Sequence, residues 1–143
     1  MKTEVSGGGV VVKKVNNNLL VLLIKDRQGD WMLPKGWIEP NETTETAAER
    51  EIREETRQTS LTRLTTLSPV RYQLHRGREK VDKTVHFILF YQQQDMPVAS
   101  QGSEGISEAG WFPYEAAFDM IAYPGSYIPV LTQAQEYLEQ HPI

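Results

Sequence analysis

The sequence of 143 residues contains no cysteine. It can therefore form no disulfide and offers no thiolate to a zinc site. It also lacks a long apolar run, because the longest one, Leu19 to Ile24, is far shorter than the roughly 20 residues that cross a bilayer. A basic segment followed by an apolar stretch, as in a secretory signal, does not stand near Met1. These absences predict a cytoplasmic protein with no membrane partner.

An excess of basic residues is also missing. Lysine and arginine together number 15 against 19 acidic residues, which gives a net charge of -4. This balance argues against broad electrostatic attraction to nucleic-acid phosphates, so no stable nucleic-acid partner is expected. The length and a hydrophobic fraction of 39% are typical of one folded domain spanning residues 1–143. The oligomeric state is left open.

The pattern of apolar residues and chain breakers predicts strands before and after one central helix. Proline and glycine in residues 31–41 indicate an ordered loop with room for a short strand. Residues 44–57 lack both, and Thr43 can cap them, so they form the expected helix. Further elements are expected as follows: a hairpin of residues 9–14 and 19–25 around Asn16, Asn17 and Asn18, strands in 61–74, 85–92 and near 111–112, and helices in 113–121 and 126–140. This order predicts an α+β or layered α/β/α fold.

The central helix carries an uneven distribution of charge. Residues 42–57 contain six glutamates and three arginines. At about 100° per residue, Glu51 and Glu55 lie on the side of the apolar Ala48 and Ile52, away from the arginines. Neither carboxylate has a basic residue three or four positions away. Two inward carboxylates without a cation are costly, and a bound divalent metal would supply the missing charge.

The remaining acidic residues of this helix fit an ordinary solvated surface. Glu49 is expected to pair with Arg53, and Glu54 with Arg50. A fully solvated, salt-bridged helix is therefore the alternative to a metal site. If a metal binds, oxygen donors without cysteine favour Mg²⁺ or Mn²⁺ over Zn²⁺.

The spacing of these residues resembles a known signature. Gly36, Glu42 and residues 50–55, with the sequence Arg-Glu-Ile-Arg-Glu-Glu, look like the Nudix box of hydrolases that split nucleoside diphosphates linked to another group. The resemblance continues in Gly-Gly-Gly-Val-Val-Val at residues 7–12, in residues 31–36 and in residues 108–111, so it covers nearly the whole chain. It implies a Nudix-type α/β/α sandwich with a mixed central sheet.

The resemblance also implies a metal-dependent pyrophosphohydrolase. Glu51, Glu54 and Glu55 are implied to hold one or more Mg²⁺ ions, with Mn²⁺ as a possible substitute. The carbonyl of Gly36 is a further candidate ligand, and Glu104, in a later loop, is another.

The resemblance also implies catalytic roles for residues of the box. Arg50 is implied to orient the catalytic glutamates by hydrogen bonding. The general base is left open among Glu54, Glu55 and a carboxylate from a loop. For that loop carboxylate, Glu104 and Glu108 are the candidates, and an ordinary surface glutamate is the alternative for each.

Six residues are candidates for substrate contacts: Lys35, Arg71, Tyr72, Arg76, Lys83 and Tyr123. Lys35 precedes the box glycine and is placed to reach a phosphate as a point charge. The basic run within residues 71–83 suits a long polyphosphate, with a solvated hairpin as the alternative. Tyrosines, together with Trp37 and His86, are candidates to stack on a base, although such residues are more often part of a core.

Within the family, the order of Arg71-Tyr72, a basic loop, residues 85–87 and residues 110–112 is most similar to small bacterial diadenosine polyphosphate hydrolases. A diadenosine polyphosphate is therefore the expected substrate. The alternatives are a nucleoside triphosphate pyrophosphatase, an RNA 5′ pyrophosphohydrolase and a diphosphoinositol polyphosphate hydrolase. A module that binds a nucleotide as a sensor without cleaving it is the alternative outside the enzymes.

The end of the box departs from the family pattern. Arg57 and Gln58 stand where a glycine and an aliphatic residue are usual. The glycine normally ends the helix in a left-handed conformation. We expect either that Arg57 adopts this costly geometry or that the helix ends differently, and neither change removes a metal ligand.

Overall fold

The computed structural model describes residues 1–99 and 105–143. Their helices are α1 (Thr44–Thr56), α2 (Tyr114–Met120) and α3 (Pro124–Gln140). Their strands are β1 (Lys2–Val15), β2 (Asn18–Asp26), β3 (Trp31–Met32), β4 (Lys35–Trp37), β5 (Thr62–Thr66), β6 (Val70–Arg76), β7 (Glu79–Tyr91) and β8 (Ile106–Pro113).

The strands form a mixed sheet with β1 near its centre. The order is β3-β2-β1-β7-β5, with β4 paired to β1, β6 to β7 and β8 to β2. β1 and β7 run parallel over a register from Lys2↔Val81 to Val12↔Tyr91. β1 pairs antiparallel with both β2 and β4. The predicted mixed sheet is therefore confirmed.

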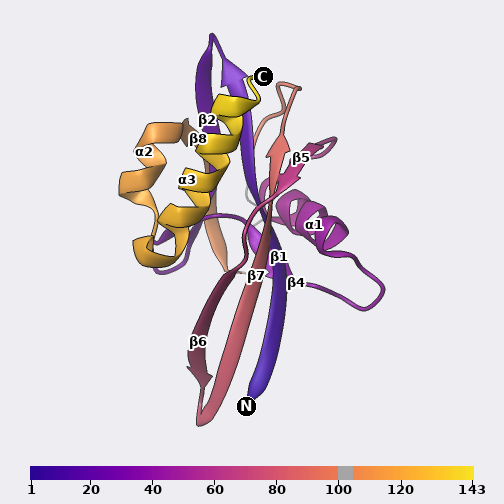
Figure 1. Ribbon diagram of the computed structural model, residues 1–143, viewed down its shortest axis with the longest axis vertical. Helices are drawn as coiled ribbons and strands as arrows, with labels where there is room; N and C mark the ends of the chain where they lie inside the picture. Colours follow the sequence, from indigo (N-terminus) through magenta and orange to yellow (C-terminus); the bar gives the residue numbers. More distant parts are fainter. Residues whose placement is uncertain (100–104) are drawn as a thin grey trace.

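Helices cover both faces of this sheet. In Figure 1, α1 lies on one side of β1 and β7, whereas α2 and α3 lie on the other. Two buried clusters correspond to these sides. The predicted α+β, layered α/β/α fold is confirmed.

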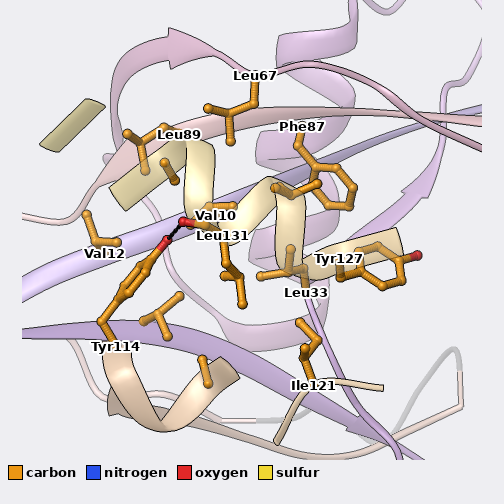
Figure 2. Packing of buried hydrophobic residues seen from close by; sticks show 14 of the residues in the cluster. Val10, Val12, Leu33, Leu67, Phe87, Leu89, Tyr114, Ile121, Tyr127 and Leu131 are labelled. Atoms are coloured by element: carbon orange, nitrogen blue, oxygen red, sulfur yellow. Dashed lines mark hydrogen bonds between the residues drawn. The ribbon is translucent and has the colours of Figure 1, made fainter. Parts of the chain in front are cut away.

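The larger cluster lies between the sheet and the two C-terminal helices. Figure 2 shows Val10, Phe87 and Leu131 packed there among aliphatic and aromatic side chains. The buried hydroxyl of Tyr114 donates to the carbonyl of Leu131 at 2.8 Å, which ties α2 to α3. The smaller cluster, between the sheet and α1, comprises Val11, Leu22, Ala48, Ile52, Ile88 and Phe90.

The N-terminal hairpin is confirmed, and it begins earlier than predicted. Val15 lies opposite Asn18, which leaves a two-residue turn. Its residues, Asn16 and Asn17, have φ angles of 52° and 66°. Asparagine tolerates this left-handed region, and such turns match the twist of the flanking strands.

Several other boundaries differ from the prediction. The strand character expected in residues 61–74 is divided between two strands, β5 and β6, separated near Pro69, which lacks an amide donor. The loop of residues 31–41 contains the short strands β3 and β4. β7 begins at Glu79, so the basic run forms the hairpin of β6 and β7. α1 agrees with the prediction to within one residue.

Glycines in β1 let α1 approach the sheet. A Cβ at Gly7 would lie 2.8 Å from the carbonyl oxygen of Thr44, and one at Gly9 would lie 2.7 Å from Cδ1 of Ile52. Both distances are too short for a real contact. On the opposite face, a Cβ at Gly8 would lie 2.6 Å from the carbonyl oxygen of Pro34. The triple glycine therefore brings the helix and the loop before β4 close to the same strand.

The C-terminal end of α1 keeps the left-handed geometry without a glycine. Arg57 has φ 64° and ψ 18°, and its amide donates to the carbonyl of Arg53 at 2.8 Å. Gln58 is fully buried, and its side-chain Nε2 donates to the carbonyl of Pro97 at 3.1 Å. Of the two expectations for this end, the structure shows the one in which arginine adopts the costly conformation.

No helix within the described ranges is long and apolar enough to span a membrane.

Candidate active site

α1 presents two buried carboxylates to the sheet. The helix begins with a capping box, in which the amide of Thr46 donates to Oγ1 of Thr43 at 3.1 Å and the amide of Thr43 donates to Oγ1 of Thr46 at 2.9 Å. One helical face then carries Glu51 and Glu55, both buried. Glu54 lies between them in sequence, and its side chain is 35% exposed. The predicted inward face is confirmed.

The guanidinium of Arg50 joins several groups of this site. Its Nη1 donates to Glu51 at 2.7 Å and lies 3.3 Å from Glu54. Its Nε donates to Glu42 at 2.7 Å, and its Nη2 donates to the carbonyl of Trp37 at 2.9 Å. The expectation that Glu51 has no cation from its own helix is therefore wrong. The helical spacing rule overlooked this contact because a long arginine side chain can reach the next residue.

These contacts shift the pKa values of Glu42 and Arg50. The hydrogen bond from Arg50 lowers the pKa of Glu42, and the donated amide of Glu39 lowers it further. Hydrogen bonding to Glu42 and to Glu51 raises the pKa of Arg50. Arg50 thus connects the loop before the helix to the buried carboxylates.

β4 closes over the two buried carboxylates. The amide of Lys35 donates to Oε1 of Glu55 at 3.1 Å. Gly36 faces Glu51 so closely that a Cβ at Gly36 would overlap the Glu51 carboxylate. Only glycine fits there, which gives a physical reason for this box residue.

The oxygen donors beside Gly36 suit a hard divalent cation, although they do not form a preorganised coordination site. Among residues 1–99 and 105–143, no three acidic or histidine side chains gather closely enough to hold a metal. Arg50 contacts both Glu51 and Glu54, and its single positive charge offsets part of theirs. The cradle of Gly36 and the all-oxygen donor set of Glu51 and Glu55 nevertheless suit Mg²⁺.

The loop carboxylates and one helical pair differ from the expectations. Glu104 lies outside the described residues. Glu108 is exposed on β8 and pairs with Lys25 at 3.1 Å, so it is a surface residue here. Glu49 accepts from Nε of Arg63 at 2.7 Å, in place of the expected pair with Arg53. Arg63 belongs to β5, and helical spacing carries no information about that neighbour.

Two cations of the basic run, Arg76 and Lys83, are paired with Glu4. Arg76 makes a two-pronged contact with Glu4, through Nε at 2.7 Å and Nη2 at 2.8 Å. Lys83 is buried, donates to Oγ of Ser6 at 2.7 Å and lies 3.7 Å from Glu4. We call Glu4, Ser6, Arg76 and Lys83 the Glu4 cluster. The sequence reasoning missed Glu4 and Ser6, although strand alternation places both on one face of β1.

Burial and charge shift the pKa values around this cluster. The hydrogen bond from Arg76 lowers the pKa of Glu4 to about 2. Burial lowers the pKa of Lys83, and the nearby cation of Lys35 lowers it further. Burial also lowers the pKa of Lys35, while Glu55 and Glu51 oppose that change. Lys35 therefore links the buried carboxylates electrostatically to the Glu4 cluster.

Trp37 is an exposed aromatic residue beside this cluster. It is 58% exposed. The ring centre lies 5.9 Å from Cζ of Arg76 and 5.6 Å from Nζ of Lys83. Core packing, the alternative weighed for this residue, does not apply.

A cavity of about 480 Å³ lies near the same sheet face. It is lined by Met32, Tyr72, Gln73, Leu74, Tyr123, Ser126 and Tyr127. Tyr72 lies directly opposite Lys83 in the pairing of β6 and β7, so the cavity adjoins the Glu4 cluster. Tyr123 is exposed. We call this space the tyrosine cavity, and the sequence reasoning missed the contributions of Met32 and Tyr127.

Two other candidates lie apart from the tyrosine cavity. Arg71 alternates with Tyr72 on β6 and is exposed, but it does not line this cavity. His86 lies opposite Gly7, on the sheet face that α1 covers. The structure therefore brings together only part of the predicted substrate contacts.

Comparison with known proteins identifies related folds and sequences. The model of the NUDIX domain family matches residues 6–131. An 8-oxo-(d)GTP phosphatase of Mycolicibacterium smegmatis is 29% identical over 105 residues, which cover 73% of this chain. The match covers 30% of that relative's length, so this chain corresponds to only a part of it.

Solved structures show the same fold. The Ap4A hydrolase of C. elegans, in a binary complex, superposes with a TM-score of 0.79 at 22% identity and covers 96% of this chain and 98% of its own. A Nudix hydrolase from M. smegmatis, RenU, superposes with a TM-score of 0.77 at 19% identity, covering 100% of this chain and 91% of its own.

Proposed function

Because this chain belongs to the NUDIX domain family, we propose that it is a Mg²⁺-dependent hydrolase of pyrophosphate bonds in nucleotides. The observation that carries the proposal is the packing of Gly36 against the buried Glu51, with Glu55 held beside them by the amide of Lys35. A helix that serves only to stabilise the fold would not need two buried carboxylates packed against a strand position, Gly36, that has no room for a Cβ.

The metal-binding role falls to the oxygen donors of this site. Glu51, Glu54, Glu55 and the carbonyl of Gly36 would hold Mg²⁺. When bound, the ion would neutralise phosphate charge and lower the pKa of water.

Arg50 is a positioning residue in this proposal. Its contacts with Glu42 and the carbonyl of Trp37 fix the guanidinium from outside the helix. The guanidinium in turn orients Glu51 and Glu54. Glu54 has the solvent access needed to accept a proton from the attacking water, and Glu55 is the alternative acceptor.

The substrate we favour is a dinucleoside polyphosphate such as a diadenosine polyphosphate. Tyr72 and Tyr123 offer aromatic surface for a base at the tyrosine cavity. Lys35, Arg76 and Lys83 provide cations between this cavity and the buried carboxylates. Glu4 is the one carboxylate of the Glu4 cluster, so these three cations keep a net positive charge that would attract phosphates.

A second candidate substrate is a nucleoside triphosphate. The mycobacterial relative, at 29% identity, is described as an 8-oxo-(d)GTP phosphatase. The tyrosine cavity suits one base of either kind of nucleotide.

The test is a substrate panel with Mg²⁺, with the products separated by chromatography. It includes diadenosine polyphosphates, nucleoside triphosphates with and without an oxidised base, 5′-triphosphorylated RNA and a diphosphoinositol polyphosphate. We expect turnover of a diadenosine polyphosphate that chelation of Mg²⁺ abolishes. Glu54→Gln and Glu55→Gln should each lower kcat by about 100-fold or more, because each removes a charged donor from the reaction centre.

Glu49→Gln is the matched control. It makes the same chemical change on the same helix, at a residue that contacts Arg63 away from Gly36. It should retain wild-type turnover. Binding of a nucleotide without metal-dependent turnover in the wild-type chain would reject the enzyme and support a sensor.

A further inference from the structure

The exposure of Trp37 is unusual for a tryptophan that belongs to a strand. It is one of six large hydrophobic residues with high exposure in the described parts of the chain. Met1 and Ile143 are terminal, Val5 and Val15 have short side chains, and Tyr123 lines the tyrosine cavity. Trp37 stands directly after the box glycine. A large exposed ring next to a candidate reaction centre is typical of a recognition surface.

The position of Trp37 is fixed by contacts on several sides. Its carbonyl accepts from Nη2 of Arg50, the same guanidinium that contacts Glu51. Its ring lies within 6 Å of the cations of Arg76 and Lys83, a distance at which a cation is attracted to an aromatic ring. The backbone of Trp37 is therefore tied to Arg50, and its ring lies beside two cations.

Strand register determines which face this ring shares. Trp37 pairs with Ser6 of β1, and Glu4 of β1 pairs with Lys83 of β7. Lys83 in turn pairs with Tyr72 of β6. Directly paired residues point to the same face, and so do residues two apart on one strand. Trp37, the Glu4 cluster and Tyr72 therefore share one face, in the strand order β4, β1, β7 and β6.

Two aromatic surfaces thus flank one cationic cluster. The tyrosine cavity lies beyond Lys83 on one side, and Trp37 lies on the other. A mononucleotide has a single base and can occupy only one of these surfaces. A dinucleoside polyphosphate has a base at each end and an anionic chain between them, which matches the order of aromatic, cationic and aromatic groups.

We propose that the ring of Trp37 is a second base-stacking surface, which selects substrates that carry a second nucleobase. This inference rests on the proposed nucleotide hydrolase and names the group at the far end of its substrate. The tyrosine cavity receives one base, the exposed guanidinium of Arg76 contacts the phosphates, and Trp37 receives the other base. Lys35 and the buried Lys83 add positive charge behind the phosphates. Trp37 then acts as a specificity-determining residue, with no part in the transfer of the proton.

The experiment measures equilibrium binding of two probes that resist hydrolysis, in the presence of Mg²⁺. One is a diadenosine tetraphosphate with methylene bridges, and the other is an adenosine triphosphate analogue with the same bridges. Trp37→Ala should weaken binding of the dinucleotide by about 5- to 150-fold, the effect of losing one base–aromatic stack. Binding of the mononucleotide should weaken much less, so that the preference for two bases falls.

Trp37→Phe is the matched control, because it keeps an aromatic ring and should keep most of that preference. Both variants retain the carbonyl that Arg50 contacts. An equal loss for the two probes, no loss for the dinucleotide, or a wild-type chain that binds the dinucleotide no better than the mononucleotide would overturn the inference. Neither probe is turned over, so the result is independent of the turnover that tests the proposed hydrolase.

Discussion

Arg57 ends α1 with φ 64° and ψ 18°, a left-handed conformation that costs an L-residue roughly 1–2 kcal/mol. Its amide still donates to the carbonyl of Arg53, which satisfies the end of the helix. The neighbouring Gln58 is buried and hydrogen-bonded, so the chain cannot move to a more relaxed path without losing those contacts. The strain at one residue therefore maintains the geometry of the next.

Arg57→Gly should relieve this strain. We expect a rise of up to about 1 kcal/mol in the free energy of unfolding, because glycine has no Cβ but gains freedom in the unfolded chain. Urea unfolding followed by circular dichroism measures the change. Arg53→Gly is the control inside the same helix, where glycine should lower stability by about 1 kcal/mol. Equal destabilisation by both variants would show that Arg57 is not strained.

At the scale of elements, a buried amide pair joins the end of α1 to the end of β7. Nε2 of Gln92 donates to Oε1 of Gln58 at 3.1 Å and to the carbonyl of Thr59 at 3.0 Å. Nε2 of Gln58 donates to the carbonyls of Met96 and Pro97. This network fixes the segment that follows β7 against the helix that carries the candidate site. It also explains why a polar residue can replace the usual aliphatic one at position 58.

Gln92→Leu should lower the free energy of unfolding by about 1–3 kcal/mol, because it removes the donor from two buried acceptors. Gln58→Leu should have a similar cost. The double variant should cost less than the sum of the two, since the residues share a hydrogen bond. Chemical unfolding of the four proteins measures this coupling.

The matched control for these glutamine variants is Gln93→Leu, which changes the exposed residue next to Gln92. It should stay within about 0.5 kcal/mol of the wild type. Additive costs for the two buried glutamines would contradict the shared network.

At the scale of the whole molecule, charges far apart in sequence connect the start of β1 to the β6–β7 hairpin. Figure 1 shows these strands as a long arm that extends away from the helices. Glu4 contacts Arg76 and Lys83 within this arm. The net charge of -4 conceals this arrangement, since it averages a helix with buried carboxylates and a hairpin with paired cations.

Stability should depend on acidic pH through Glu4. Its pKa falls from an ordinary 4.5 to about 2 in the folded chain, so the unfolded chain binds more protons in this range. The contribution of Glu4 is complete above about pH 4.5 and is lost as the pH falls toward 2. Urea midpoints measured between pH 5 and pH 3 should therefore decrease, and Glu4→Gln should flatten that decrease.

Glu139→Gln is the control for this prediction, because Glu139 is exposed on α3 and outside the Glu4 cluster. It should keep the wild-type dependence on pH. A Glu4→Gln variant with an unchanged slope would place the acid sensitivity elsewhere, for instance at Glu42, whose pKa is also lowered.

Local sequence patterns were sufficient to predict several helices and strands and part of the candidate site. The hairpin depended on Asn16 and Asn17, whose conformations suit a tight turn. The inward position of Glu51 and Glu55 followed from helical periodicity, which relates residues one turn apart. The break between β5 and β6 was missed because a single proline between two strand-forming runs is a weak signal.

The turns, the helix with two inward carboxylates and the oxygen donors could be predicted from the sequence, because each depends on residues a few positions apart. The contact of Arg50 with Glu51, the contacts of Glu4 with Arg76 and Lys83, and the place of Trp37 beside them became visible in the folded chain. Such contacts depend on side-chain conformations and on the register of strands separated by more than 70 residues. Many registers satisfy the local pattern, and packing of the whole chain selects one.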